Sequence, residues 1–304
     1  MKISHFLVAL SVICLWGANF SFVKMGLSQI DPFILTGLRF LLAAIPAVFF
    51  ISRPQVSFTL LIIYGLIFGV GLWAMLTLAI KAGVSAGMAS LLLQSSAFIS
   101  VLIGVFFLKE KIGIIKLIGL VIAICGLLIV LTVQDGSVTL LGIMFVMIAA
   151  SAMSVSAFIV KWANIKQMFA FVVWSCLFAS ITLFLLSLVT SGTQAFVELA
   201  NNLGPVGIFF VLVQAYPVTL LGYWIWNRLV IIYPISTMAP LTLLIPVFGF
   251  ICSMYFYGET LAGGKVIACG LIVIGITLVM LEPAIKQWVT GWRIYKHLKK
   301  SPNI

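Results

Sequence analysis

Arg39 carries a charge inside a long apolar stretch, residues 33–51, and no carboxylate lies in the middle of any such stretch. As a helix residue, at about 1.5 Å of rise per residue, it would lie ~9 Å from the start of that stretch. Two interpretations follow. The charge can reach outward to water, or it can stay buried and bind an anion, since a guanidinium contacts a carboxylate through two hydrogen bonds. The lack of a protein carboxylate favours the second.

Neutral polar and aromatic residues in other apolar stretches extend this candidate site. Three amides offer hydrogen bonds, although bonding from helix to helix explains them equally well. A tyrosine hydroxyl adds a polar group, and indole rings would form the walls. The predicted substrate-binding set is Arg39, Asn19, Gln94, Gln214, Tyr223, Trp16 and Trp226.

Two prolines, Pro240 and Pro246, share one apolar stretch. Proline has no N–H group and interrupts the hydrogen bonds of a helix. Irregular backbone within a membrane is tolerated where it is buried in protein or lines a cavity. We therefore expect a helix bend at these prolines that takes part in gating.

No enzyme active site is expected. One segment, residues 83–87, matches the G-x-S-x-G nucleophile pattern around Ser85. A base is missing, because the two histidines, His5 and His297, lie at the chain ends and no acid is in the middle of an apolar stretch. These small residues are better explained as the start of a helix. No cluster of His, Cys and carboxylate residues suggests a metal, and no cofactor is predicted.

The composition defines the elements that must position these residues. Of the 304 residues, 64% are hydrophobic and only 8% are charged, and the mean hydropathy is +1.32. Soluble domains have about a quarter charged residues, so the chain is predicted to be an integral membrane protein with the lipid bilayer as a partner. Ten apolar stretches are each long enough to cross a bilayer: 5–24, 33–51, 58–80, 84–107, 113–133, 140–160, 168–189, 206–227, 233–257 and 264–282.

The net charge of +11 indicates topology and not a nucleic-acid partner. If the N-terminus is cytoplasmic, only three of the 17 Lys and Arg residues fall outside: Lys24, Lys81 and Lys265. Arg39 lies within a stretch, and the others fall on the cytoplasmic side. Cytoplasmic loops carry the excess of basic residues in membrane proteins. We expect both termini in the cytoplasm and the protein in the cell (inner) membrane.

An internal repeat divides the chain. A shift of 149 residues places 107–110 on 256–259, so that Glu110 falls on Glu259, and it also places Lys116 on Lys265. The halves hold five stretches each, and an odd number forces them into opposite orientations, as in many secondary transporters. The prediction is an all-α polytopic membrane protein of ten transmembrane helices as two inverted-topology five-helix repeats, 1–135 and 136–282. A basic amphipathic tail, 283–304, would follow, and a short amphipathic helix is predicted at 195–203.

Several motifs resemble those of one family. Trp16-Gly17-Ala18-Asn19-Phe20 is followed by Lys24 and then by Leu38-Arg39-Phe40. Leu108-Lys109-Glu110-Lys111 precedes a glycine-rich stretch, and the pattern recurs around Glu259. These motifs resemble the EamA family of the drug/metabolite transporter superfamily, over essentially the whole chain as two EamA repeats.

The resemblance implies an alternating-access carrier that exports small amino acids and metabolites, with cysteine or O-acetylserine-like substrates favoured. An importer of a small metabolite with the same fold, or a non-transporting intramembrane protein, remains an alternative, and a homodimer is left open. A proton relay usually needs a carboxylate or histidine within a span. None is present here, so facilitated or exchange transport is predicted.

Overall fold

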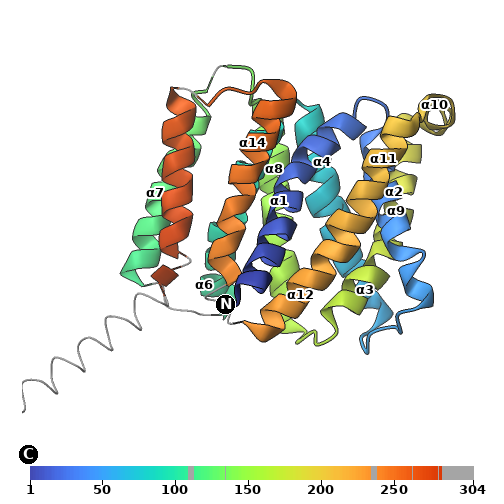
Figure 1. Ribbon diagram of the computed structural model, residues 1–304, viewed down its shortest axis with the longest axis horizontal. Helices are drawn as coiled ribbons and strands as arrows, with labels where there is room; N and C mark the ends of the chain where they lie inside the picture. The colour runs from blue at the N-terminus through green and yellow to red at the C-terminus, as the bar shows by residue number, and fades with distance from the viewer. Residues whose placement is uncertain (109–112, 134, 234–237, 262, 280, 283–304) are drawn as a thin grey trace, which may run out of the picture.

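The computed structural model describes residues 1–108, 113–133, 135–233, 238–261, 263–279 and 281–282. All regular secondary structure in these ranges is helical. The helices form a bundle whose loops lie at its two ends (Figure 1). We call these the N-terminal end, where α1 begins, and the α10 end.

The first part of the chain begins with α1 (Ile3–Gly26), α2 (Pro32–Ala44) and a 3-10 turn, η1 (Ala47–Phe49). One continuous helical segment follows, made of α3 (Phe58–Gly65), the π-helix η2 (Leu66–Ala74) and α4 (Met75–Lys81). The remaining helices are α5 (Ala86–Leu93), α6 (Ser96–Leu108) and α7 (Ile114–Val130).

The second part is also helical. It contains α8 (Leu140–Trp162), α9 (Met168–Ser191) and the short α10 (Gln194–Asn202). A second continuous segment contains α11 (Pro205–Val213), the π-helix η3 (Gln214–Leu221) and α12 (Gly222–Ile232). The 3-10 helix η4 (Ala239–Leu243), α14 (Leu244–Tyr257) and a last helix, Gly264–Val279, complete it.

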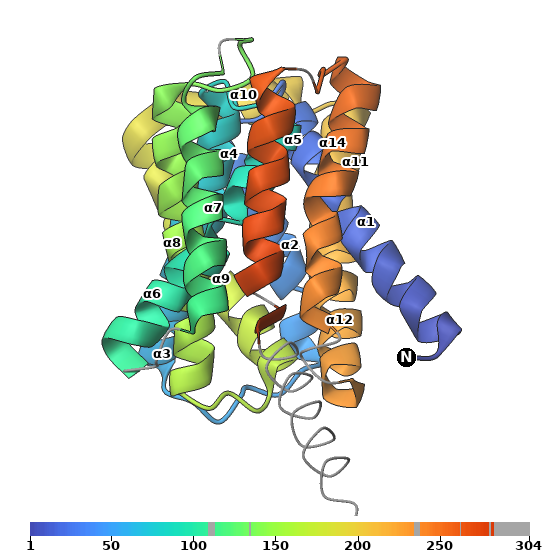
Figure 2. The same cartoon turned by 90° about the vertical axis from the view of Figure 1, so that its left-hand side faces the viewer.

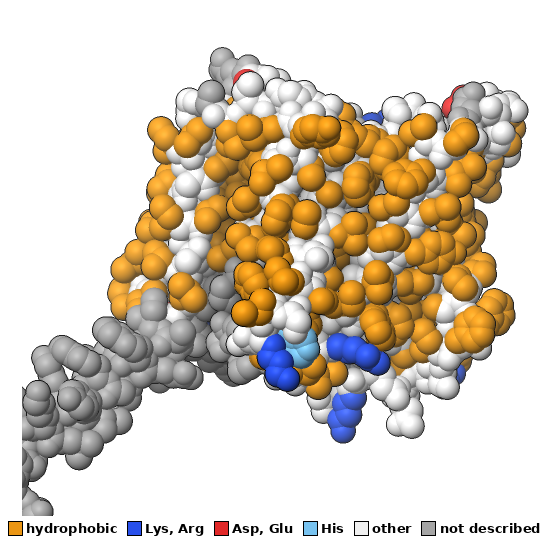
Figure 3. All heavy atoms as spheres, in the orientation of Figure 1, with side chains coloured by type: hydrophobic (Ala, Val, Ile, Leu, Met, Phe, Trp, Pro, Cys, Tyr) orange, Lys and Arg blue, Asp and Glu red, His pale blue; other side chains and the backbone are white. Residues whose placement is uncertain are grey.

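Seven helical segments are long and apolar enough to cross a membrane. Three shorter apolar helices, Ile114–Val130, Leu241–Tyr257 and Gly264–Val279, cover the other predicted stretches. Apolar side chains cover the visible face of the bundle between its ends (Figure 3). A multi-pass membrane protein is thereby confirmed, whereas ten spans, the inverted repeat and the orientation of the termini stay predictions. The predicted tail, 283–304, lies outside the described residues.

Four helical segments are interrupted. In η3, Pro217 has no N–H to donate, and the Thr219 hydroxyl donates to the Gln214 carbonyl at 2.8 Å. The other π-helix is η2. Gln94 and Ser95 form a turn between α5 and α6. Pro240 lies in the 3-10 helix η4, and Pro246 is buried in the first turn of α14. The bend that takes part in gating stays a prediction.

Helices from the two parts of the chain are interleaved, since α1 packs along α14 and α2 along α9. Glycines allow the closest approaches. A Cβ atom at Gly17 would lie 2.7 Å from the Ile245 carbonyl oxygen, and one at Gly275 would lie 2.5 Å from that of Gly119. Small residues at interfaces let membrane helices approach each other closely. The second contact joins α7 to the last helix, and these two lie side by side in both ribbon views (Figure 2).

The predicted amphipathic helix at 195–203 is confirmed as α10. Its residue Ala195 is buried, and Phe196 and Leu199 pack against a small apolar cluster that includes Ile34 of α2. Asp31 begins α2 by accepting hydrogen bonds from the Phe33 and Ile34 amides. Its carboxylate also accepts hydrogen bonds from Ser187 and Ser191 of α9. The α10 end is therefore held by both apolar and polar contacts.

Candidate functional site

Arg39 lies on α2 within the bundle and is 1% exposed. Its Nε atom donates to the Thr219 hydroxyl at 2.9 Å, and Thr219 in turn donates to the Gln214 carbonyl oxygen. In a π-helix, residues five positions apart lie next to each other. The π-helix η3 therefore brings the Thr219 hydroxyl to the Gln214 carbonyl oxygen. The burial argues against the interpretation that Arg39 reaches outward to water.

The guanidinium of Arg39 also stacks on an aromatic ring. Its central carbon is 3.8 Å from the centroid of Trp73, on η2, and 5.6 Å from that of Phe40. The stacking fixes the plane of the guanidinium. Its Nη2 atom is buried and has no hydrogen-bond partner. No ion pair joins Arg39 to an acid among the described residues, so the arginine keeps a donor for another group.

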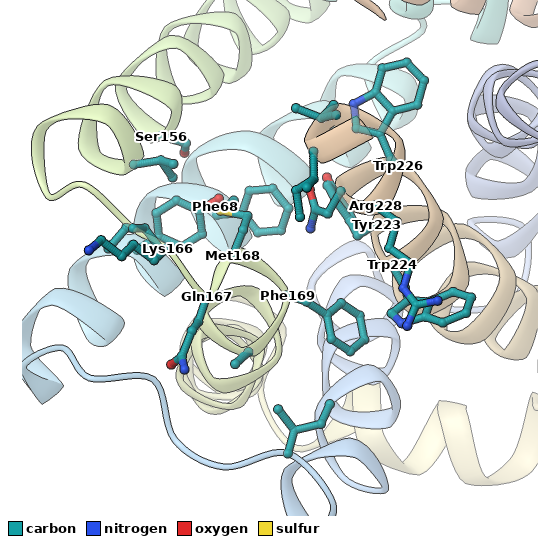
Figure 4. A pocket seen from close by; sticks show the side chains of 18 of the residues that line it. Phe68, Ser156, Lys166, Gln167, Met168, Phe169, Tyr223, Trp224, Trp226 and Arg228 are labelled. Carbon is teal, nitrogen blue, oxygen red and sulfur yellow. The ribbon is translucent and has the colours of Figure 1, made fainter. Parts of the chain in front are cut away.

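A cavity of about 1100 Å³ lies at the N-terminal end of the bundle. It is bounded by α3, η2, α8, α12 and the segment that leads into α9 (Figure 4). Lys166 and Arg228 lie among its lining residues, and the Arg228 guanidinium stacks on Trp224 at 4.2 Å. Such a volume is large enough for a small metabolite.

Three rings separate this cavity from Arg39, and we call them the aromatic layer: Tyr64, Phe68 and Tyr223. All three line the cavity. The Phe68 ring is 5.5 Å from Tyr64 and 6.0 Å from Tyr223. It also lies 5.8 Å from Phe40 and 6.4 Å from Trp73, which are the rings beside Arg39. Arg39 itself does not line the cavity, so the layer closes the route between them.

Trp16 supports the layer from behind. Its ring is 5.4 Å from Tyr223 and 5.3 Å from Trp226, and its indole N–H donates to the Val218 carbonyl at 3.0 Å. Trp226 lines the cavity, as the prediction of a wall requires, whereas Trp16 is not among the lining residues. Trp16 therefore positions Tyr223 and the π-helix η3.

The predicted residues thus divide into two groups. The structure brings Arg39, Gln214 and Tyr223 together, and the Gln214 side chain is buried with its Nε2 atom unpartnered. Asn19 is also buried with both amide atoms unpartnered, and Gln94 lies in the turn between α5 and α6. No hydrogen bond among the described residues joins either of these two to Arg39.

Four residues of the site were not predicted from the sequence. Thr219 and Trp73 contact the Arg39 side chain, and Tyr64 and Phe68 belong to the aromatic layer between the cavity and the rings beside Arg39. A signal existed for Thr219, since it follows Gln214 by five residues and Pro217 by two. A proline in such a segment frees backbone carbonyls for a nearby hydroxyl. Tyr64, Phe68 and Trp73 are ordinary apolar-span residues by type, so only their placement reveals them.

A second polar cluster lies at the α10 end, and we call it the Glu259 network: Glu259, Lys265, Asp135, Ser85 and Ser253. Lys265 is 2% exposed and lies 3.2 Å from Glu259 and 2.8 Å from Asp135. The hydroxyls of Ser85 and Ser253 each donate to the Glu259 carboxylate at 2.5 Å. The Gly87 amide at the start of α5 donates to it as well. The network joins α5 and α14, two helices from different parts of the chain.

One expectation about Ser85 was wrong. A carboxylate does lie beside it, because the loop after α14 brings Glu259 back over the start of α5. The helix-start interpretation holds nevertheless, since Ser85 caps α5 by accepting a hydrogen bond from the Met88 amide. Glu259 accepts a hydrogen bond from the Gly87 amide at the start of α5 and pairs with Lys265. Its counterpart in the predicted repeat, Glu110, lies outside the described residues.

Asp135 is the member of the network that lies outside the spans. Partial burial raises the pKa of its carboxyl, but hydrogen bonds from Lys265 and Ser137 outweigh burial and lower it to about 2. Asp135 is therefore a carboxylate at every physiological pH, and the ion pair with Lys265 persists.

Comparisons with known proteins agree with this architecture. A "Probable amino-acid metabolite efflux pump" of Salmonella typhimurium is 36% identical over 275 residues, covering 88% of this chain and 92% of that protein. A protein with the same description from Escherichia coli is 34% identical with the same coverage. One known crystal structure is 21% identical and covers 92% of this chain and 98% of its own, with a TM-score of 0.54, which supports the fold alone.

The sequence profile described as "EamA-like transporter family" matches this chain twice, over residues 2–132 and 140–281. Those two matches take in every described helix that surrounds Arg39, the cavity and the Glu259 network. Both the profile and the similar proteins describe transport across a membrane and no catalysed reaction. The chain is a transmembrane transporter, not an enzyme, and it belongs to the EamA-like transporter family.

Proposed function

We propose that this protein is an alternating-access carrier that exports small amino-acid metabolites and holds their carboxylate at Arg39. One observation carries the proposal: Arg39 is 1% exposed, its Nη2 atom has no partner, and no described acid neutralises it. A buried charge is costly unless it is paired. A substrate carboxylate supplies the missing charge and hydrogen-bond acceptor.

The substrates are small metabolites of the cysteine or O-acetylserine kind. The two similar proteins are described as probable amino-acid metabolite efflux pumps, and this supports the class of cargo. Gln214 and Tyr223 border Arg39 and shape the polar part of the site, while Trp226 forms a wall. Asn19 and Gln94 join the site when the helices around them rearrange.

The conformation corresponds to a carrier open at one end and closed at the other. The cavity of about 1100 Å³ reaches the aromatic layer from the N-terminal end, and the Glu259 network joins α5 to α14 at the α10 end. A smaller cavity of about 650 Å³ at the α10 end is lined by Asp31, Lys81 and Glu198 and by none of the aromatic layer. Most of the visible basic side chains lie at the N-terminal end and the visible acidic ones at the other (Figure 3). Under the positive-inside rule this supports cytoplasmic termini, an inner-membrane location and an inward-open state.

An inverted repeat of residues 1–135 and 136–282 would supply the opposite state. A shift of 149 residues converts Gly119 to Ala268 and Gly126 to Gly275. Gly119 approaches Gly275 and Gly126 approaches Ala268, so the two contacts exchange under the shift, as a two-fold relation requires. The break at Gln94 likewise shifts to the junction of η4 and α14 at Leu243. These pairings support the repeat, and bending at Pro240 and Pro246 would accompany the exchange.

Uptake of labelled cysteine into proteoliposomes tests the role of Arg39. We expect Arg39→Ala to lower uptake at least tenfold, because one lost charge-assisted hydrogen bond is worth about 1.5–3 kcal/mol. Arg39→Lys should restore part of the rate, since it keeps the charge but not the planar fork. Arg53→Ala is a matched control, because Arg53 also stacks on a ring, that of Phe58 at 4.4 Å, but does not line the cavity. Undiminished uptake by both Arg39 variants would refute the proposal.

A further inference from the structure

The charged side chains that line the N-terminal cavity are all positive among the described residues. Lys166 and Arg228 line the cavity, and Arg39 lies behind the aromatic layer. No acid is among the described residues that line the cavity. This one-sided charge distribution goes beyond a single carboxylate site and concerns which substrates can enter.

Each described acid has a place elsewhere. Asp135 and Glu259 bind Lys265, and Asp31 caps α2 at the α10 end. Glu198 accepts a hydrogen bond from Gln194 on α10, and Glu282 pairs with Lys116 at 3.7 Å. The amino group of a substrate therefore meets no carboxylate from this set along the cavity.

Two buried donor atoms near the cavity have no hydrogen-bond partner. The buried Nδ2 atom of Asn227, on the cavity wall, has no partner, and neither has Nη2 of Arg39. A guanidinium can only donate hydrogen bonds, so Arg39 requires an acceptor from a ligand, whereas the Asn227 amide can present either its NH2 group or its oxygen. Ring faces of the aromatic layer are the available surface for an ammonium group, and such contacts are weak.

We propose that the carrier selects its substrates by charge: it requires a carboxylate, accepts monoanionic acyl derivatives at least as well as zwitterions, and rejects cations. This inference rests on the proposed function and adds a substrate class to it. Lys166 and Arg228 would draw anions into the cavity, and Arg39 would bind them. A cation would meet three like charges and no counter-charge.

Three competitors with one skeleton test the proposal in proteoliposomes containing the full chain. At pH 6, N-acetylcysteine is an anion, cysteine a zwitterion and cysteinamide a cation. We expect N-acetylcysteine to inhibit uptake of labelled cysteine at no higher concentration than unlabelled cysteine, and cysteinamide to need at least tenfold more. Equal inhibition by cysteinamide, or an N-acetylcysteine more than tenfold weaker than cysteine, would overturn the inference.

Variants locate the source of the selection. Lys166→Gln and Arg228→Gln should each lower the ratio of anion to cation inhibition on the order of threefold, and added salt should do the same in the unmodified protein. Arg53→Gln removes a stacked arginine at the same end that does not line the cavity, and it should leave the ratio unchanged. A ratio that stays unchanged in Lys166→Gln, in Arg228→Gln and on addition of salt contradicts the assignment to the cavity.

The two proposals fail in different ways. If Arg39→Ala abolishes cysteine uptake but the three competitors inhibit equally, charge selection is wrong and the carrier function stands. If Arg39→Ala leaves cysteine uptake intact, the proposed function itself fails. Competition is measured as a ratio within one preparation, so differences in the amount of folded protein do not enter.

Discussion

The two ends of the bundle use charge in opposite ways. At the N-terminal end, Lys166 and Arg228 line an open cavity without an opposing carboxylate. At the α10 end, Lys265 is 2% exposed between two carboxylates, and hydroxyl and amide donors satisfy the rest of Glu259. The cations at the N-terminal end are free to contact a ligand in the cavity, whereas Lys265 at the α10 end is bound to two carboxylates within the protein.

The largest effect is expected from Lys265→Met, which removes the cation of the Glu259 network and keeps the volume. Two carboxylates then face each other, one of them buried, and removing one partner of a buried ion pair costs about 3–5 kcal/mol. Thermal unfolding in detergent should show a clear drop in midpoint. Lys81→Met is the control, because Lys81 is an exposed lysine at the same end and such changes usually stay within about 0.5 kcal/mol. Equal thermal midpoints for Lys265→Met and Lys81→Met would show that the paired lysine of the Glu259 network does not stabilise the α10 end.

An intermediate effect is expected from Phe68→Leu, which thins the aromatic layer. Cys176 is buried in the same region as Arg39 and provides a reporter. In a variant that keeps only this cysteine, the rate of labelling by a small maleimide should rise several-fold. Phe250→Leu is the matched control, because Phe250 is buried beside Gly87 at the closed end. If Phe250→Leu raised the labelling rate of Cys176 and Phe68→Leu did not, the assignment of the open end would be wrong.

The smallest effect is expected from Asp135→Asn. The pKa of Asp135 is about 2, below its ordinary value near 3.9. A lowered pKa stabilises the fold above the ordinary value and the gain is lost as pH falls through the folded value. The thermal midpoint of the unmodified protein should therefore exceed that of the variant above about pH 4, and the gap should vanish toward pH 2. Glu198→Gln, an exposed acid on α10, should show no such gap; a constant gap at all pH values would contradict the assignment.

Much of the fold follows from hydropathy alone. The apolar stretches predict where the helices lie, and Phe196 and Leu199 predict the face of α10. The π-helices were not predicted, and in η3 a contact with another helix takes part. Thr219 satisfies the Gln214 carbonyl while it also accepts from Arg39 on another helix. Periodicity in one stretch carries no information about such a contact.

The candidate site was predictable where a residue is unusual for its surroundings. Arg39 stands out because an unpaired charge in a span is rare. Tyr64 and Phe68 do not stand out, since aromatic side chains are common in spans, and their role comes from lying between Arg39 and a cavity. Lys265 misled the charge count, because a lysine assigned to an outer loop is in fact buried and neutralised by two acids.

The interleaving of α1 with α14 and of α2 with α9 has a consequence for biosynthesis. When α1 leaves the ribosome, more than 200 residues remain to be made before its partner exists. Until α14 is made, the face of α1 around Gly17 that packs against it is exposed to lipid. The early helices are therefore stable in the bilayer one by one, and assembly of the bundle is a late step that follows insertion of nearly the whole chain.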